Sequence, residues 1–558
     1  MNWMDTYRLW LECTADEAEI SDELHAIEQD SAAIEDRFYK ELEFGTGGLR
    51  GVLGAGTNRM NVFTVGKATQ GYSNYLNKTV NTPAVAIAYD SRIHSDLFAE
   101  RAAAVFAANG IRVFIYPKLM PTPSLSFAVR DLHCDGGIVI TASHNPAKYN
   151  GYKVYGSDGC QITTESAKAI QQEIDAVDTF RDVRCGNLNE FVENRMISYI
   201  GEDTVRWYLA AVDTASVLPA EVARDVDIVY TPLNGAGISC VPQCLKEHGF
   251  ANIIIPDEQK NPDGNFPTCP YPNPEIREAL EVGLAWAERT GSELLLATDP
   301  DCDRVGAAVK DGNGYTLING NEMGVLLLDF ICKMRLKQGT MPTKPVVVKT
   351  IVTTPMAARL AEHYGLELRD VLTGFKFIGE QIGILEKSGE ESRYMFGFEE
   401  SYGYLSGSFV RDKDAVNASL LICEMFAYYK AQGKTLTDVL EELYREYGFY
   451  ESRLLTFAFE GSAGFKKMQE LIQNLREDCP KYLAGYEVER MIDYQNDETG
   501  LPKSNVLRFF LSGGQEAVVR PSGTEPKLKV YLTAIGEKRT ESTSVSERLA
   551  NFFKGWAN

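Results

Sequence analysis

The chain has 558 residues, which is too many for one hydrophobic core and predicts about three to five domains. Its 44% hydrophobic and 24% charged residues are ordinary for a globular protein. The formal net charge of −22 argues against a nucleic-acid partner, because a phosphate backbone attracts a basic surface. A small phosphorylated ligand would require cations gathered in one place.

The start of the chain, "MNWMDTYRLWLECTADEAEI", is acidic and helix-like, without the basic start and apolar core of a signal peptide. The run "MGVLLLDFICKM" is too short and interrupted to cross a bilayer. The 11 cysteines form no C-x-x-C pair, and unpaired thiols are typical of a reducing compartment. We therefore expect a cytoplasmic protein without a membrane partner.

In chain order, short apolar runs alternate with helical stretches. The run "AVAIAYD" (84–90) predicts a strand, and the residues 95–110 predict a helix ended by glycine. Further predicted strands are "RVFIYP", "GGIVITAS", "VDIVYTP", "NIIIPD", "ELLLATD", "PVVVKT" and "RYMFGFEES". Continuous apolar strands between helices are typical of α/β units with mainly parallel sheets.

The last hundred residues follow a different pattern. Several strands surround loops in "NVLRFFLSGGQEAVVRPSGTEPKLKVYLTAIG", and the helix-like "SVSERLANFFKGW" closes the chain. We place the domain limits near residues 206, 325 and 453, which divides the chain into 1–205, 206–325, 326–453 and 454–558. The first part includes a helical N-terminal extension.

The loop "TASHNP" follows a predicted strand and carries Ser143 and His144. The G-x-S-x-G elbow of a hydrolase is absent. Adjacent side chains seldom point at one another, so we expect His144 to be badly placed as a base for Ser143. Read alone, the loop is more typical of a structural turn.

The loop "ATDPDCDRVG" places Asp299, Asp301 and Asp303 at alternate positions after an apolar strand. Three crowded carboxylates require a counter-charge, so a cation is expected. A calcium loop is excluded because Arg304 stands where glycine is required and Lys310 replaces the terminal glutamate. Hard oxygen ligands therefore favour Mg²⁺.

Two further loops carry polar side chains for a ligand. In "GFEESYGYLSG", Glu399 and Ser401 offer a carboxylate and a hydroxyl to neighbouring sugar hydroxyls. In "RPSGTEPKLKVY", a guanidinium, hydroxyls and exposed backbone N–H groups suit a phosphate. "FGTGGLRG" has a similar glycine-and-cation character, and the absence of a Walker A sequence disfavours a nucleoside triphosphatase. Together the loops predict phosphoryl transfer on a polyhydroxylated phosphate ester.

The motifs "TASHNP", "DPDCDR", "GFEESYG" and "RPSGTEPK", in this order, resemble the four signature loops of the α-D-phosphohexomutase superfamily. The resemblance extends from "FGTGGLRG" to the C-terminus and, with "TGFKFIG", is most similar to the phosphoglucomutase branch. It implies four domains around a central cleft, three related mixed α/β domains plus a smaller C-terminal α+β domain. Each domain would contribute one loop.

The resemblance also implies roles for single residues. Ser143 would be the phosphoserine, and Asp299, Asp301 and Asp303 would bind Mg²⁺ together with Ser143. The other implied catalytic residues are Lys153, which would move protons, Arg50, near the transferring phosphoryl group, and His144. The implied substrate-binding residues are Arg304, Thr373, Gly374, Lys376, Glu399, Ser401, Lys413, Arg520, Ser522, Gly523 and Thr524.

The implied activity is that of an isomerase, an intramolecular phosphotransferase that interconverts α-D-glucose 1-phosphate and glucose 6-phosphate with glucose 1,6-bisphosphate as intermediate and activator. Phosphomannomutase-like members carry a histidine in a "TGH" loop, whereas Phe375 stands here, which weakens a mannose assignment. A phosphopentomutase acting on ribose or deoxyribose 1-phosphate, a phosphatase and a sugar-phosphate sensor stay open. Sugar phosphates are the only partners indicated, and no residue indicates an oligomeric state.

Overall fold

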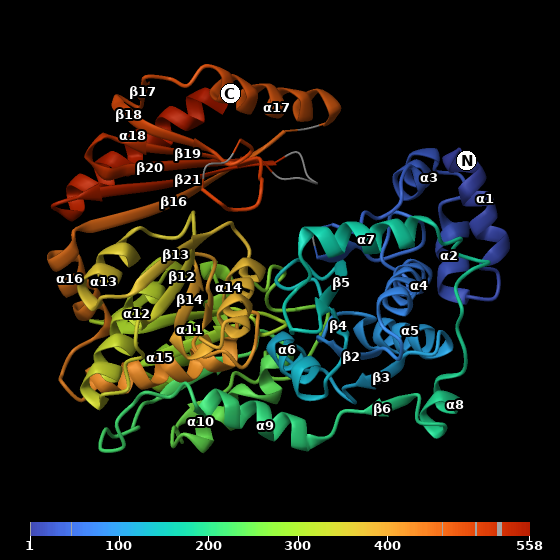
Figure 1. The fold of residues 1–558 in the computed structure, drawn as a ribbon, viewed down its shortest axis with the longest axis horizontal. Helices are drawn as coiled ribbons and strands as arrows, with labels where there is room; N and C mark the ends of the chain where they lie inside the picture. Colours follow the sequence, from blue (N-terminus) through green and yellow to red (C-terminus); the bar gives the residue numbers. More distant parts are fainter. Residues whose placement is uncertain (1, 46, 460, 497–498, 522–526, 558) are drawn as a thin grey trace.

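The computed structural model describes residues 2–45, 47–459, 461–496, 499–521 and 527–557 (Figure 1). It contains four sheets that follow one another along the chain. In Figure 1 the N-terminal blue part lies on the right, and the orange and red C-terminal part stands above the yellow third part. This confirms the α/β class and the four-part architecture. No helix among these residues is both long and apolar enough to span a bilayer.

The first sheet has the order β1-β5-β4-β2-β3-β6. Strands β4, β2, β3 and β6 are parallel, and β5 and β1 continue the sheet in antiparallel pairs. The strands are β1 (Gly48–Val52), β2 (Ala84–Tyr89), β3 (Arg112–Ile115), β4 (Gly136–Ile140), β5 (Tyr149–Gly156) and β6 (Ile197–Tyr199). The helices are α1 (Trp3–Cys13), α2 (Ala18–Ala26), α3 (Ser31–Phe38), α4 (Val62–Thr79), α5 (Ser95–Ala108), α6 (Thr122–Asp131), α7 (Thr164–Asp175) and α8 (Leu188–Glu193).

The second sheet has the order β11-β10-β9-β7-β8, in which β9, β7 and β8 are parallel and β10 and β11 antiparallel. The strands are β7 (Ile228–Thr231), β8 (Ile253–Ile254), β9 (Leu294–Thr298), β10 (Val305–Asp311) and β11 (Gly314–Ile318). The helices are α9 (Glu202–Asp213), the 3-10 turn η1 (Ala236–Ser239), α10 (Val241–Glu247) and α11 (Arg277–Thr290).

The third sheet, β13-β12-β14-β15, again joins three parallel strands to an antiparallel one. The strands are β12 (Val346–Thr350), β13 (Glu367–Val371), β14 (Tyr394–Glu399) and β15 (Gly403–Leu405). The helices are α12 (Gly320–Gln338), α13 (Met356–Tyr364), α14 (Phe375–Lys387), the 3-10 turn η2 (Glu391–Arg393), α15 (Ala415–Lys430) and α16 (Leu436–Tyr447). Parallel strands extended by antiparallel ones therefore recur in the first three sheets.

The fourth sheet, β16-β21-β20-β19-β18-β17, is antiparallel throughout. The strands are β16 (Phe449–Ala458), β17 (Tyr482–Leu483), β18 (Tyr486–Asp493), β19 (Leu507–Leu511), β20 (Gln515–Pro521) and β21 (Lys527–Gly536). The helices are α17 (Gly461–Glu477), the 3-10 turn η3 (Ser512–Gly514) and α18 (Arg539–Ala557). This sheet and its helices form the smaller C-terminal α+β domain.

The three domain limits placed from the sequence each fall inside an element: 206 in α9, 325 in α12 and 453 in β16. A limit inside a hydrogen-bonded element is unfavourable, because few contacts should cross a domain border. We therefore propose limits at the ends of these elements, before α9, at the β11–α12 turn, and at Gly448 before β16. Gly448 has a φ of +100°, which only glycine adopts without strain.

Three of the loops predicted to carry site residues begin at the carboxyl ends of parallel strands. Ser143 follows β4, Asp299 follows β9 directly, and Glu399 is the last residue of β14. Loops at this end of a parallel sheet are where α/β folds bind ligands, since successive strands open there towards one edge. The fold therefore brings three of the predicted loops to equivalent positions.

Candidate active site

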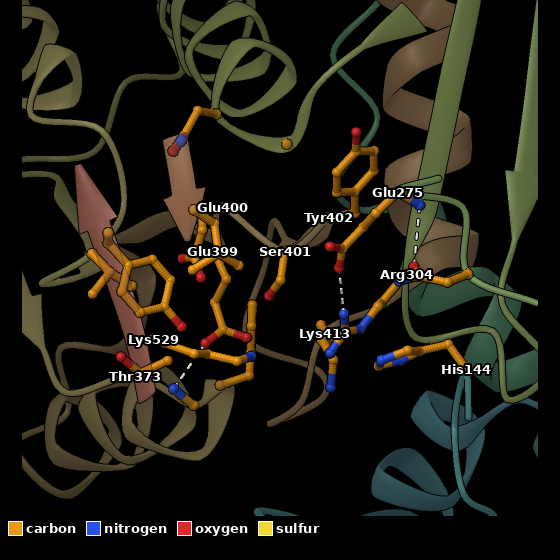
Figure 2. A pocket seen from close by; sticks show the side chains of 18 of the residues that line it. His144, Glu275, Arg304, Thr373, Glu399, Glu400, Ser401, Tyr402, Lys413 and Lys529 are labelled. Atoms are coloured by element: carbon orange, nitrogen blue, oxygen red, sulfur yellow. Dashed lines mark hydrogen bonds and ion pairs between the residues drawn. The ribbon is translucent and has the colours of Figure 1, made fainter. Parts of the chain in front are cut away.

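Segments from all four domains border one cavity of about 710 Å³. Figure 2 shows Glu399 and Thr373 on one side of it and Arg304 and His144 on the other. The predicted site residues that line it are Arg50, Ser143, His144, Lys153, Arg304, Thr373, Gly374, Glu399, Ser401, Lys413 and Arg520. Side chains from distant stretches of the sequence therefore meet in one place.

Ser143 has a left-handed backbone, with a φ of +52°. The hydroxyl of Thr141 accepts a hydrogen bond from the Ser143 N–H at 2.8 Å and helps to hold this conformation. Ser143 Oγ donates to Asp299 Oδ2 at 2.8 Å and lies 3.1 Å from His144 Nδ1. The two adjacent side chains therefore do approach one another, and this geometry does not support the expectation that His144 is badly placed as a base for Ser143. The unusual φ turns the serine side chain towards its neighbour.

Asp299, Asp301 and Asp303 are fully buried, and one ligand oxygen from each lies within 4.8 Å of the others. Among the described residues, no hydrogen-bond donor reaches Oδ1 of Asp301 or Asp303. Burial and the two neighbouring carboxylates raise the pKa of Asp299 well above its ordinary value. Three converging carboxylates with unused oxygens fit a hard divalent cation such as Mg²⁺.

Two lysines neutralise part of this negative charge. Lys153 Nζ lies 2.7 Å from Asp301 Oδ2 and 3.2 Å from Asp303 Oδ2, and Lys413 Nζ lies 2.7 Å from Asp303 Oδ2. Burial by itself lowers the pKa of Lys153, but the two carboxylates outweigh it and raise that pKa. Both lysines are therefore ammonium ions at neutral pH, at the border between the carboxylates and the cavity.

More cations surround the serine. Arg304 Nη1 donates to Glu275 Oε1 at 2.6 Å, and Arg50 Nη1 donates to Asn145 Oδ1 at 3.5 Å. Burial, then Arg304 and Arg50, lower the pKa of His144 well below its ordinary value. Glu275 was missed in the sequence, where "YPNPE" resembles an ordinary turn. Only the folded chain, which places Glu275 just before α11 and beside Arg304, indicates a role for it.

The side of the cavity opposite His144 carries groups that suit hydroxyls (Figure 2). Glu399 Oε1 accepts the N–H of Gly374 at 2.8 Å, and the buried Thr373 Oγ1 makes no hydrogen bond to any described residue. Burial and the adjacent Glu400 raise the pKa of Glu399 to about 7. These groups therefore offer both donors and acceptors to a sugar.

Lys376 does not line the cavity. Its ammonium lies 5.3 Å from the ring centroid of Phe377, and its carbonyl accepts the thiol of Cys160 at 3.3 Å. The contact with substrate that the resemblance implied for Lys376 stays a prediction that this geometry does not support.

The C-terminal domain contributes further cations. Arg520 on β20 lies opposite Lys529 on the neighbouring strand β21, and both residues line the cavity. Burial, then the charge of Arg520, lower the pKa of Lys529. Lys529 and Tyr531 were missed, although their alternate positions in "KLKVY" place them on one face of a strand. The other predicted phosphate contacts, Ser522, Gly523 and Thr524, lie outside the described residues.

Three family models match consecutive parts of the chain. They are the phosphoglucomutase/phosphomannomutase alpha/beta/alpha domains I, II and III, which match residues 41–181, 207–312 and 319–447. A phosphoglucomutase of Staphylococcus saprophyticus is 37% identical over 97% of this chain and 98% of its own length. One of Staphylococcus aureus is 37% identical over 91% of this chain and 92% of its own length.

Solved structures share the fold. The open form of parafusin, a Paramecium phosphoglucomutase, has a TM-score of 0.68 at 17% identity, over 92% of this chain and 95% of its own. A phosphoglucomutase/phosphomannomutase family protein of Burkholderia thailandensis has a TM-score of 0.67 at 19% identity, over 92% and 97% of the two chains. With its motifs assembled around one cavity, the chain belongs to the phosphoglucomutase/phosphomannomutase family of the α-D-phosphohexomutase superfamily.

Proposed function

We propose that the protein is a phosphoglucomutase that interconverts α-D-glucose 1-phosphate and glucose 6-phosphate, with Ser143 as the carrier of the phosphoryl group. The contact between Ser143 Oγ and Asp299 Oδ2 at 2.8 Å carries this proposal, because it joins a nucleophile to a cluster of metal ligands at the cavity wall. The phosphoglucomutases that the chain resembles over nearly its whole length support the hexose substrate.

The reaction has two phosphoryl transfers. A sugar hydroxyl attacks the phosphorus on Ser143, a new O–P bond forms, and the bond between phosphorus and Ser143 Oγ breaks. The resulting bisphosphate reorients, and its other phosphoryl group returns to Ser143. The proton of the attacking hydroxyl ends on the Ser143 oxygen. We assign its relay to the Lys153 ammonium, beside Asp301 and Asp303, which would give one proton to the departing Ser143 Oγ and take the proton of the sugar hydroxyl in its place.

Asp299, Asp301, Asp303 and Ser143 are the residues that would hold Mg²⁺, which supplies positive charge against the serine phosphate. Arg50 and Arg304 would add positive charge around the transferring group, and His144 would contact it from the adjacent position. Because Arg304 is already paired with Glu275, it is held at the cavity before substrate binds.

The remaining contacts divide between the two ends of the substrate. We assign Thr373, Gly374, Glu399 and Ser401 to the sugar hydroxyls, and Lys413 to the region between sugar and carboxylates. We assign Arg520 and Lys529 to the phosphate that does not react, since two adjacent cations suit a dianion. Ser522, Gly523 and Thr524 complete this proposed phosphate loop.

The test is mutase turnover with Mg²⁺ and glucose 1,6-bisphosphate on glucose 1-phosphate, ribose 1-phosphate and deoxyribose 1-phosphate. We expect the highest kcat/KM on the glucose ester and a loss of more than about a thousandfold in Ser143→Ala. Ser166→Ala, a serine of α7, is the matched control. Faster pentose turnover would replace the hexose assignment, and binding without turnover would indicate a sugar-phosphate sensor.

The free cysteines support a cytoplasmic setting.

A further inference from the structure

Arg92, which follows β2, contacts the segment that carries Ser143 but does not line the cavity. Its side chain is buried, with 2% of the residue exposed. The guanidinium donates to four backbone carbonyl oxygens of the segment 143–149: Nη1 to Pro146 at 3.0 Å and to Tyr149 at 2.9 Å, and Nη2 to Ser143 and Asn145. One side chain therefore ties the whole serine loop together.

Asp90 connects the same guanidinium to the other end of the loop. Arg92 Nε lies 3.4 Å from Asp90 Oδ2, and this oxygen accepts the hydroxyl of Thr141 at 2.6 Å. The Thr141 hydroxyl in turn accepts the Ser143 N–H. The backbone of Ser143 is thus held on its N–H side through Thr141 and Asp90, and on its carbonyl side by Arg92.

The second domain covers this arrangement. Phe266, which is 1% exposed, places its ring centroid 5.1 Å from Arg92 Cζ, a cation–π contact. The backbone beside it approaches closely, because a Cβ on Gly264 would lie 2.4 Å from the N of Ile93. The domain that supplies Asp299, Asp301 and Asp303 therefore also packs on the residue that shapes the serine loop.

These contacts stabilise a conformation that is unfavourable by itself. A left-handed backbone is sterically unfavourable at a residue other than glycine. The four carbonyl oxygens that bind Arg92 carry negative partial charge. Because Arg92 does not line the cavity, these oxygens point towards its guanidinium rather than into the cavity. A dianionic phosphate on Ser143 would otherwise meet these dipoles.

We infer that Asp90, Arg92 and Phe266 form a serine-loop clamp, a set of positioning residues that holds Ser143 in its reactive conformation and makes that conformation depend on contact between the first two domains. The inference rests on the proposed role of Ser143 in phosphoryl transfer. The clamp does not touch the reacting atoms and acts only through the loop.

The clamp is tested with Arg92→Lys, Arg92→Ala and Phe266→Leu. Lysine keeps the charge but cannot bond four carbonyl oxygens, and leucine keeps an apolar contact without the cation–π interaction. We expect kcat to fall by about 100-fold in the Arg92 variants and about fivefold in Phe266→Leu, while KM stays within about threefold, because a misplaced reacting group affects chemistry more than binding. Guanidinium chloride at millimolar concentration should partly restore kcat in Arg92→Ala.

Arg112→Ala is the control, because Arg112 also lies over an aromatic ring, that of Phe114, but on β3. It should keep the wild-type kcat. A second measurement does not depend on activity: amide hydrogen exchange of residues 143–149 should become faster in the Arg92 and Phe266 variants and not in Arg112→Ala. If Arg92→Ala does not fold, Phe266→Leu and Arg92→Lys carry the test.

Two results separate the inference from the proposed function. An active wild type whose Arg92→Lys and Phe266→Leu variants keep both kcat and the slow exchange would overturn the clamp. An inactive wild type whose variants show the faster exchange would support the clamp as a loop-holding device and contradict the phosphoglucomutase assignment instead.

Discussion

His144 lies among cations, 3.1 Å from Ser143 Oγ through its Nδ1. Burial, Arg304 and Arg50 lower the pKa of its imidazole well below the ordinary value. In the unphosphorylated protein the ring is therefore neutral at physiological pH, and it acts as a hydrogen-bonding neighbour of the serine rather than as a cation.

We predict that the ring resonances of His144 do not titrate between pH 6 and pH 8 in the unphosphorylated protein. Nuclear magnetic resonance of the histidine rings checks this, with His144→Gln to assign the signal and the other histidines of the chain as internal controls. A His144 titration midpoint near the ordinary value of about 6.5 would contradict it.

The metal ligands make a second prediction at this scale. Asp301 carries a buried Oδ1 that accepts no hydrogen bond from any described residue. Replacing this oxygen therefore removes a possible metal ligand without breaking a hydrogen bond at that atom. We expect Asp301→Asn to weaken Mg²⁺ binding, measured by calorimetry, by at least about tenfold. Asp311→Asn, at the end of β10, is the control. Equal affinity in both variants would place the ion elsewhere.

Among the elements, α15 has an unusual start. Its N-cap Asp414 is buried and accepts the N–H groups of Val416 and Asn417. Both of its carboxylate oxygens also lie within hydrogen-bond distance of the Tyr208 hydroxyl, which donates to them. Burial raises the pKa of Asp414 to about 6 in spite of these bonds. The folded protein therefore holds the Asp414 proton more tightly than the unfolded chain, whose aspartate pKa is about 3.9.

The sign of the pH effect follows from this difference. The folded state binds more protons than the unfolded state, so this group's contribution to stability is largest at acid pH and falls as pH rises from about 4 to about 6. Asp414→Asn keeps a capping oxygen and does not titrate. We expect the free energy of unfolding of the variant, relative to wild type, to increase by about 1 kcal/mol between pH 5 and pH 7.5. Urea unfolding of both proteins at pH 5 and pH 7.5 measures this change. The same difference in unfolding free energy between variant and wild type at both pH values would contradict the prediction.

At the scale of the molecule, the third and fourth domains are joined by a charge network. Asp370 Oδ1 on β13 lies 3.0 Å from Lys349 Nζ, and its Oδ2 accepts Arg508 Nη1 at 3.2 Å. Arg508 on β19 also forms an ion pair with Glu516 at 2.8 Å. Burial favours the neutral form of Asp370, but the two cations outweigh it and lower its pKa. Apolar side chains pack beside this network: Ile351, Val352, Leu372, Tyr494, Val506, Val518 and Tyr531.

Arg508 thus links the domain that carries Arg520 and Lys529 to the third domain. We expect Arg508→Gln to raise the KM for glucose 1-phosphate by about tenfold, equivalent to about 1.4 kcal/mol, with a smaller change in kcat, because the contact with the remote phosphate is loosened. Arg476→Gln is the matched control: its side chain is similarly buried, but it pairs with Asp493 in the same domain. Equal KM values for the two variants would contradict the role of the network.

Most of the strands and the class of the fold were predictable from local sequence. The apolar run 84–90 became β2 and the predicted helix 95–110 became α5, because continuous apolar strands and capped helices are local signals. The domain limits near 206, 325 and 453 stay predictions, and each falls inside a helix or strand of the structure. Nothing local in α9, α12 or β16 shows which neighbour each element packs against.

The sequence by itself also determined the chemical character of the site. A serine loop, three alternating aspartates and a glycine-rich cationic loop are short stretches whose chemistry depends on residue type and spacing. Only the tertiary structure decided which distant groups support them. Glu275 reaches Arg304, Lys529 stands beside Arg520, and Arg92 binds the loop of Ser143. The positive φ of Ser143 is supported both by the neighbouring Thr141 hydroxyl and by the distant Arg92, and only the first of these contacts lies within the local sequence.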